Sequence, residues 1–294
     1  DPLRPFFMQV GYHRPHPPLD PPIEWLRRLD NVDLPEVPIG DWADENDRPV
    51  TDPHSYDYGR LPAQVLDDVR RAYFAQIMHL DDQIGRLLNH CRRNGLMKNT
   101  WIVFMSDHGE LLGDHHMWRK VVPWEGSASV PLVMMPPLYG EYKDAVGKVD
   151  DRCLTHADIM PTFLKLAGID IPECVDGQDI LGDHHHEFIH GEHAPHWQYV
   201  TDGKEKFAWQ STTGKQWFFD LTNDPQELHN AIDDADKHTL EGDWQQAGDW
   251  QHPFRRYKLA GYNKTIKDVR GNVIDLDRHT IQDHFKMLGY NEGI

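Results

Sequence analysis

The chain has 294 residues, and 30 Lys and Arg against 48 Asp and Glu give a formal net charge of −18. This charge repels nucleic acid and anionic membranes, so we expect neither as a partner. Hydrophobic residues make up 39% of the chain, enough for a sizeable core, which excludes disorder throughout. The three cysteines show no paired spacing, which argues against a disulfide framework or a cysteine zinc site.

Strand and helix patterns alternate through the first half of the chain. Short apolar runs predict buried strands at 5–12, 101–105 and 130–135. Apolar residues at intervals of three or four predict a helix over 65–91, and a capping box begins another at 155–167. The alternation predicts a parallel sheet with helices on both faces. Residues 15–62, rich in Pro and Asp, are expected to form a long irregular segment.

The pattern changes after about residue 181. Residues 207–210 and 216–221, separated by Ser-Thr-Thr-Gly, predict an antiparallel hairpin. A short helix is expected at 280–288, where a glycine follows the last apolar position. We therefore divide the chain into a main α/β domain over residues 1–181 and a small α+β subdomain over 182–294.

Polar residues follow two of the predicted strands. Asp107 and His108 come directly after the strand at 101–105, and Lys120 follows a glycine-containing loop. Ligands bind beyond the carboxyl ends of strands in open α/β sheets, so these residues could serve a cation and an anion. A polar turn without a ligand is the alternative for a motif this short.

The strand at 5–12 is followed by His13, Arg14 and His16 in a proline-rich segment. Imidazole and guanidinium groups suit binding of an oxyanion and protonation of a leaving oxygen. Taken alone, a stiff exit loop with surface histidines is the simpler interpretation.

Six blocks, in order, resemble the sulfatase family. They are FFMQVGYHRPHP at 6–17, SDHGE with GDH and Lys at 106–120, WEGSASVPL at 124–132, DIMPT at 158–162, DGQD at 176–179 and FDLTNDPQELHN at 219–230. Residues 11–17 and 107–120 are especially similar to iduronate-type sulfatases and phosphonate monoester hydrolases. The order of six matches makes chance a minor concern.

The resemblance implies a fold and a site. The fold would be part of an alkaline-phosphatase-like sandwich, with a mostly parallel sheet between helices and a small C-terminal α+β subdomain with antiparallel sheet. Residues 1–181 would then be the C-terminal part of a sulfatase catalytic domain. Asp107 and His108 would bind a divalent cation, usually Ca²⁺, although an imidazole ligand leaves Mn²⁺ or Zn²⁺ open.

The resemblance also assigns roles to the remaining polar residues. His16 would donate a proton to the leaving oxygen, and Lys120 would bind the sulfate oxygens. Further substrate contacts are expected from His13, Arg14, His115 and His193. For His193, ordinary surface packing is an equal alternative.

The chain departs from the family pattern at the nucleophile. None of its cysteines or serines stands in the C/S-x-P/A-x-R motif that yields formylglycine. The chain begins with Asp1-Pro2 and shows no signal peptide, so we expect a cut end and an N-terminal portion of the same enzyme as partner. Alone, the chain should be inactive and should fold poorly. A periplasmic or secreted location follows from family analogy.

Three other functions are weighed against a carbohydrate sulfatase. One is a phosphonate or phosphodiester hydrolase on the same scaffold, and another is a binding protein that has lost its nucleophile. The third is a zinc protease, from the HEFIH motif at 186–190. Gly191 follows at once and Phe188-Ile189 favours a strand, on which the two histidines are too far apart to bind one ion.

Overall fold

The computed structural model describes residues 4–44, 59–183, 186–193, 197–210 and 213–233. The chain forms two compact units. The first unit comprises Asp1–Val37, Gly59–Met105 and Leu132–Lys148, and the second comprises Pro38–Tyr58, Ser106–Pro131 and Val149–Ile294. The domain boundary at residue 181 stays a prediction, and the helix expected at 280–288 lies outside the described residues.

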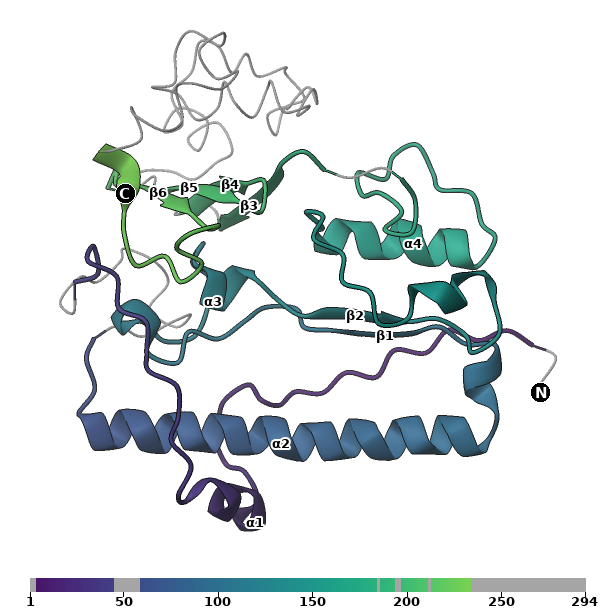
Figure 1. Cartoon of the computed structure of the whole chain (residues 1–294), viewed down its shortest axis with the longest axis horizontal. Helices are drawn as coiled ribbons and strands as arrows, with labels where there is room; N and C mark the ends of the chain where they lie inside the picture. The colour runs from purple at the N-terminus through teal and green to yellow at the C-terminus, as the bar shows by residue number, and fades with distance from the viewer. Residues whose placement is uncertain (1–3, 45–58, 184–185, 194–196, 211–212, 234–294) are drawn as a thin grey trace, which may run out of the picture. The chain divides into compact units, whose positions relative to one another are not determined.

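The long helix α2, Ala63–Arg93, dominates the first unit (Figure 1). It confirms the helix expected at 65–91, and Gly95 follows it in the left-handed conformation, with φ of 72°. Two side chains of α2 hold the segment that precedes it. The Arg71 guanidinium donates to Val32 O at 2.9 Å, and Gln76 Nε2 donates to Pro18 O at 2.9 Å.

Shorter elements complete the first unit. They are α1 at Ile23–Leu26, strands β1 at Ile102–Met105 and β2 at Leu132–Met135, and 3₁₀ turns at Arg27–Leu29, Leu96–Lys98 and Glu141–Ala145. Both strands lie where they were expected. They pair antiparallel, however, with Ile102 opposite Met135, so the parallel pairing expected for them is wrong. The long connection over 106–131 allows β1 and β2 to pair in either direction. The alternation of strand and helix patterns in the sequence therefore did not determine how they pair.

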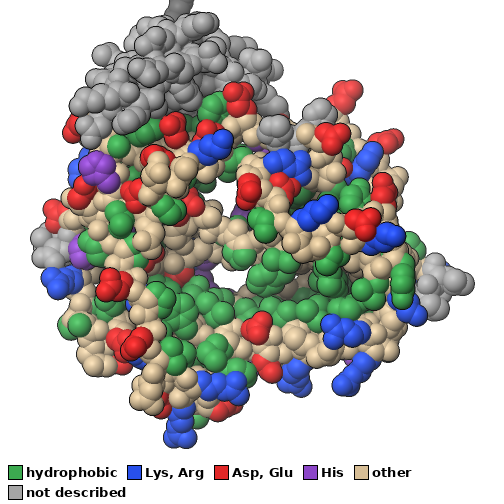
Figure 2. All heavy atoms as spheres, in the orientation of Figure 1, with side chains coloured by type: hydrophobic (Ala, Val, Ile, Leu, Met, Phe, Trp, Pro, Cys, Tyr) green, Lys and Arg blue, Asp and Glu red, His purple; other side chains and the backbone are tan. Residues whose placement is uncertain are grey.

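The apolar run at 5–12 does not form a strand in the structure, and the prediction of a buried strand is wrong for this chain. Phe7 is 75% exposed and Met8 is 59% exposed. An extended segment becomes a strand when a neighbour takes up its backbone hydrogen bonds, and no strand of the described ranges does so. Figure 2 shows a green band of hydrophobic side chains over β1, β2 and this segment.

The second unit is built around a four-stranded antiparallel sheet in the order β3-β4-β5-β6. The strands are Ile189–His193, Trp197–Thr201, Glu205–Gln210 and Gln216–Asp220, and they confirm the hairpin expected after residue 207. The helices are α3 at Glu125–Ala128 and α4 at Ile159–Leu166, with 3₁₀ turns at Asp114–His116, His156–Asp158 and Ala231–Asp233. The capping box of Thr155 and Asp158 is present as expected.

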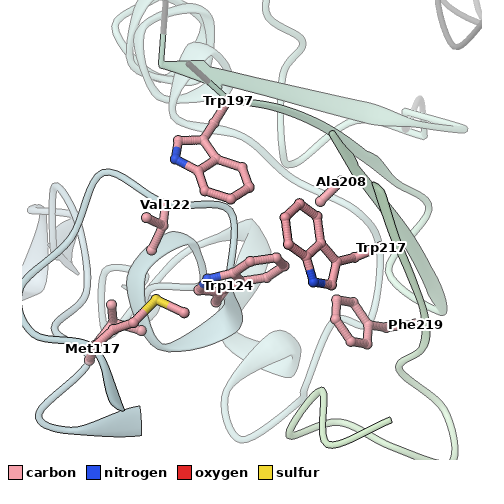
Figure 3. Packing of buried hydrophobic residues seen from close by; sticks show 8 residues of the cluster. Met117, Val122, Trp124, Trp197, Ala208, Trp217 and Phe219 are labelled. Carbon is pink, nitrogen blue, oxygen red and sulfur yellow. The ribbon is translucent and has the colours of Figure 1, made fainter. Parts of the chain in front are cut away.

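Aromatic side chains form the core of the second unit. Trp124 is fully buried between the indole of Trp197, at 5.5 Å between ring centroids, and that of Trp217, at 5.2 Å (Figure 3). Phe219 from β6 and Met117 lie in the same cluster. The core therefore fastens the residues before α3 to the sheet. In the part of the chain that the structure describes, no helix combines the length and apolar character that a membrane crossing requires.

Candidate active site

Asp107 and His108 lie at the end of β1, where the chain enters the second unit. His108 Nδ1 lies 2.8 Å from Gly109 O, and because a carbonyl oxygen only accepts, Nδ1 must carry the proton. In the neutral ring, Nε2 is then the basic nitrogen, and it lies 3.8 Å from Asp107 Oδ2. The Asp107 side chain is 88% exposed. The backbone here is held by His156 Nε2, which donates to Ser106 O at 3.0 Å.

This arrangement fits two ligands of a divalent cation. A hydrogen bond from the second ring nitrogen to a carbonyl oxygen is the usual way in which a metal-binding histidine is oriented. The carboxylate beside Nε2 supplies an oxygen ligand of the kind that Ca²⁺ prefers. Across the described residues, no group of three or more His, Cys, Asp or Glu side chains is placed to hold a metal. The pair therefore fits as part of a ligand set.

The loop that follows, residues 107–121, has an unusual backbone. The described residues contain six non-glycine residues with positive φ, and five of them lie here: Leu112, His115, His116, Arg119 and Val121. Val121, a β-branched residue, has φ of 74°. Such conformations cost free energy and persist where the surroundings impose them, which is common at binding and catalytic sites. The strained loop is therefore a candidate functional element on geometry alone.

Lys120 is partly buried near the end of this loop. Burial raises the pKa of the Glu110 carboxyl. The hydrogen bond from Arg119 N to Glu110 Oε1 and the positive charge of Lys120 oppose this rise. Lys120 thus lies close enough to Glu110 to interact with it electrostatically. Glu110 was not among the residues selected from the sequence, although it lies inside the SDHGE block.

His115 occupies a different environment from the one that substrate contact requires. It is 3% exposed, its Nδ1 accepts a hydrogen bond from Gly40 N at 3.1 Å, and its ring lies 4.7 Å from that of Trp42. Burial lowers its pKa to about 4, so the ring is neutral near pH 7. This placement favours a packing role, and substrate contact by His115 stays a prediction.

The histidines of the 186–193 region do not form a zinc-protease helix. His190 lies in β3, as the strand interpretation expected, and His186 Nε2 lies 2.8 Å from Asp158 Oδ1. His193 ends β3 opposite Trp197 and is partly buried. Its role in substrate binding stays a prediction.

His13, Arg14 and His16 belong to the first unit. The rings of His13 and His16 lie 4.9 Å apart, and Arg14 forms an ion pair with Asp20 at 2.6 Å. Arg14 also donates to His13 Nδ1 and to His16 O, each at 3.1 Å. His16 Nδ1 donates to Pro17 O at 2.9 Å, which orients the ring and assigns any proton transfer to Nε2. The structure adds the hydrogen bonds that orient these residues, and their role in substrate binding stays a prediction.

One group of buried charges was not selected from the sequence. Lys206 and Glu227 are each 1% exposed, and their side chains form an ion pair with Nζ and Oε1 2.9 Å apart. Glu227 lies in the block at 219–230. Lys206 could have been found from the alternation in β5. Alternate residues of this strand are buried, and Lys206 lies on the same inward face as Ala208.

Comparison with known proteins agrees with the fold. The family described as Sulfatase matches residues 1–169, and the family described as N-sulphoglucosamine sulphohydrolase, C-terminal, matches residues 113–247. An arylsulfatase of Clostridium perfringens is 39% identical over 245 residues, which cover 79% of this chain and 50% of the relative. Human iduronate 2-sulfatase is 38% identical over 147 residues, covering 45% of this chain and 27% of the relative.

Solved structures of sulfatases and related hydrolases have a fold similar to that of this chain. One from work on the metabolism of multiple glycosaminoglycans by Bacteroides thetaiotaomicron has a TM-score of 0.60 at 26% identity, covering 82% of this chain and 52% of that one. The phosphonate monoester hydrolase of Agrobacterium radiobacter has a TM-score of 0.52 at 25% identity, covering 61% and 40%. The fold is thus α/β of the alkaline-phosphatase-like type, with a small C-terminal antiparallel sheet.

These matches define the class as the alkaline-phosphatase superfamily. Within it, the chain belongs to the sulfatase family, whose profile covers more than half of its residues. The chain spans half or less of the length of the curated relatives named here.

Proposed function

We propose that this chain is the C-terminal portion of a sulfuric ester hydrolase that acts on a sulfated carbohydrate. The observation that carries the proposal is the strained loop at 107–121, in which Asp107, His108 and Lys120 match the family's site residues and His108 has the orientation of a metal ligand. A scaffold without a ligand gains nothing from backbone strain at this place.

Asp107 and His108 would hold the cation, with Ca²⁺ as the first candidate and Mn²⁺ or Zn²⁺ as alternatives. A bound divalent cation would supply positive charge against the oxygens of the transferring sulfate group. On this proposal Asp107 contributes a carboxylate oxygen and His108 contributes Nε2, because Nδ1 is engaged by Gly109 O.

The other residues have roles that follow from their chemistry. Lys120 would bind sulfate oxygens and stabilise the charge that develops on them. His16 would deliver a proton from Nε2 to the leaving oxygen, so that no free alkoxide forms. His13 and Arg14 would bind the substrate beside it, since Arg14 is a fixed cation and orients the backbone of His16. His193 is a further candidate for substrate contact.

The nucleophile, a formylglycine, would be supplied by an N-terminal portion of the same enzyme. Two features of the first unit support such a partner. The segment 5–12 has strand composition, yet Phe7 is 75% exposed, and Val133 of β2 is 58% exposed. Added strands and helices would cover this apolar surface. A periplasmic or secreted location is proposed by analogy with the family.

The choice of a carbohydrate rests on the relatives. They include proteins named iduronate 2-sulfatase, and one similar structure comes from work on glycosaminoglycan metabolism. Others are named arylsulfatase and choline-sulfatase, so the family also contains members named for other sulfate esters.

Assay of the protein purified from its source, with an affinity tag on this chain, tests the proposal. Denaturing mass spectrometry should find a polypeptide with the C/S-x-P/A-x-R motif and its Cys or Ser converted to formylglycine. Sulfated disaccharides should be hydrolysed, and Lys120→Ala should lower kcat by about 100-fold or more. Lys98, in a 3₁₀ turn of the first unit, provides a control: Lys98→Ala should leave kcat unchanged. Purification without such a polypeptide and without sulfatase activity contradicts the proposal.

Two alternatives give different results in the same preparation. A phosphonate monoester hydrolase would turn over aryl phosphonate esters clearly faster than aryl sulfates. This alternative is tested because the fold is similar to that of the Agrobacterium radiobacter enzyme. A binding protein that has lost its nucleophile would retain sulfated sugars without hydrolysing them, and Lys120→Ala would then weaken binding alone.

A further inference from the structure

Lys206 of β5 lies at the centre of a buried charge cluster with Glu125 and Glu227. Its ammonium group donates to Glu227 Oε1 at 2.9 Å, to Pro123 O at 2.9 Å and to Glu125 Oε1. The Lys206 side chain is fully buried, Glu227 is 1% exposed and Glu125 is 34% exposed. Burial alone lowers the pKa of Lys206, but the two carboxylates outweigh this effect and raise it, so the lysine is charged.

The cluster fixes the start of helix α3. Glu227 Oε2 accepts a hydrogen bond from Glu125 N at 2.8 Å, while Lys206 holds the carbonyl of Pro123, two residues earlier. Removing charges from water is costly, and buried ion pairs are often replaceable by apolar groups without loss of stability. A buried lysine with three oxygen partners is therefore better explained by the position it imposes than by the stability it adds.

Helix α3 in turn carries the loop at 107–121. Gly109 N donates to Ser127 O at 2.8 Å, and a Cβ on Gly109 would lie 2.1 Å from Gly126 O, so loop and helix backbones are in direct contact. Leu111, 1% exposed, packs against Gly126 from the same side. The charge cluster is thus connected to the residue beside His108 through one short helix.

The distribution of backbone strain points to the same connection. Five of the six positive-φ non-glycine residues in the described part of the chain lie in the loop, and the sixth is Glu227, with φ of 57°. A strained loop and a strained Glu227 both require surroundings that hold them. Helix α3 meets both requirements, since it contacts the loop through Ser127 and Glu227 through Glu125 N.

We infer that Lys206, with Glu125 and Glu227, is a positioning residue for the 107–121 loop: through α3 it sets where Asp107, His108 and Lys120 are presented. The inference deepens the proposed function and depends on it for the meaning of the site. None of the three cluster residues is assigned a contact with the substrate.

Hydrogen exchange of the complete protein purified from its source, with a tag on this chain, followed by NMR, tests the inference. In Lys206→Met, which keeps most of the length of the side chain and removes its charge, the Gly109 amide should exchange about tenfold faster, while amides within β5 change by less than about twofold. Lys204→Met, an exposed lysine just before β5, is the matched control and should change neither. Equal acceleration at Gly109 and throughout β5 means a structural role only, and no change at Gly109 also refutes the inference.

A second variant keeps the test decisive if Lys206→Met fails to fold. Glu125→Gln removes one partly exposed carboxylate and keeps the helix, and it should accelerate Gly109 exchange in the same direction but to a smaller extent. Unchanged Gly109 exchange in Glu125→Gln would then refute the inference.

Titration with Mn²⁺ separates this inference from the proposed function. Paramagnetic broadening of the His108 ring protons should require about tenfold more Mn²⁺ in the Lys206→Met variant of the complete protein than in its parent. If Mn²⁺ leaves His108 unaffected in the complete parent protein, the proposed metal site is wrong, while the exchange data still decide whether Lys206 positions the loop.

Discussion

Acidification from pH 7 to pH 5 should destabilise the second unit through His115. This residue is 3% exposed, and its Nδ1 accepts a hydrogen bond from Gly40 N, so protonation both charges a buried ring and removes its acceptor. Burial lowers the pKa of His115 from 6.5 to about 4. The unfolded chain therefore binds a proton at this residue more readily than the folded chain does.

The direction and the size of the stability change follow from the difference between the pKa of His115 in the folded and the unfolded chain. The stabilisation by neutral His115 is fully present above pH 6.5 and is lost as the pH falls from there through 4. The complete loss of stability is about 3.5 kcal/mol, from roughly 2.5 pKa units at about 1.4 kcal/mol each, and about 2 kcal/mol of it should be gone by pH 5. A loss of this size is a large fraction of the stability of a domain.

Urea unfolding of the complete protein purified from its source at pH 7, 6 and 5, followed by tryptophan fluorescence, measures the effect because Trp42 lies 4.7 Å from the His115 ring. His115→Asn is the matched variant: its amide oxygen can still accept from Gly40 N, and asparagine tolerates the φ of 53° found there. The variant should be less stable at pH 7 and lack this part of the pH dependence. The reasoning is refuted if parent and variant lose equal stability between pH 7 and pH 5.

Three further changes test the packing at the loop, inside helix α2 and before α4. Gly109→Ala should lower the free energy of unfolding by about 2–4 kcal/mol, because a Cβ would overlap a carbonyl oxygen of α3; an unchanged urea midpoint would contradict this contact. Gly85→Ala, in the interior of α2 with open space at the Cβ position, should instead raise it by about 0.5–1 kcal/mol in the same measurement. Asp158→Asn should cost about 2–4 kcal/mol, because the buried carboxylate accepts from His186 and from two backbone amides. The exposed Asp170→Asn is its control and should stay within about 0.5 kcal/mol in a thermal melt.

Sequence reasoning located helix α2 and the hairpin of β5 and β6 because their signals are local. The helix at Ala63–Arg93 is specified by its apolar period and its Asn-Gly ending, and the hairpin of β5 and β6 by alternation about a turn. The candidate site could be found for a related reason. Asp107, His108 and Lys120 lie within one short block, so their grouping is a property of the chain itself.

The direction of strand pairing and the burial of a strand are not local properties. The run at 5–12 has the composition of a buried strand, yet Phe7 is 75% exposed, because burial depends on a neighbour that the run does not specify. The antiparallel pairing of β1 and β2 depends likewise on the path of the connection between them. The composition of a segment sets which secondary structure it favours, whereas the segments that pack against it decide whether it forms a buried strand.

By itself the sequence determined the family, the long helix α2 and the hairpin of β5 and β6, and it supplied the candidate residues of the proposed site. Tertiary structure alone decided that His115 is buried against Trp42, that His108 is oriented by Gly109 O, and that Lys206 meets Glu227. The physical reason is the distance along the chain over which each effect acts. Helix period, capping and alternation act over a few residues, whereas desolvation and ion pairing depend on segments that meet only when the chain has folded.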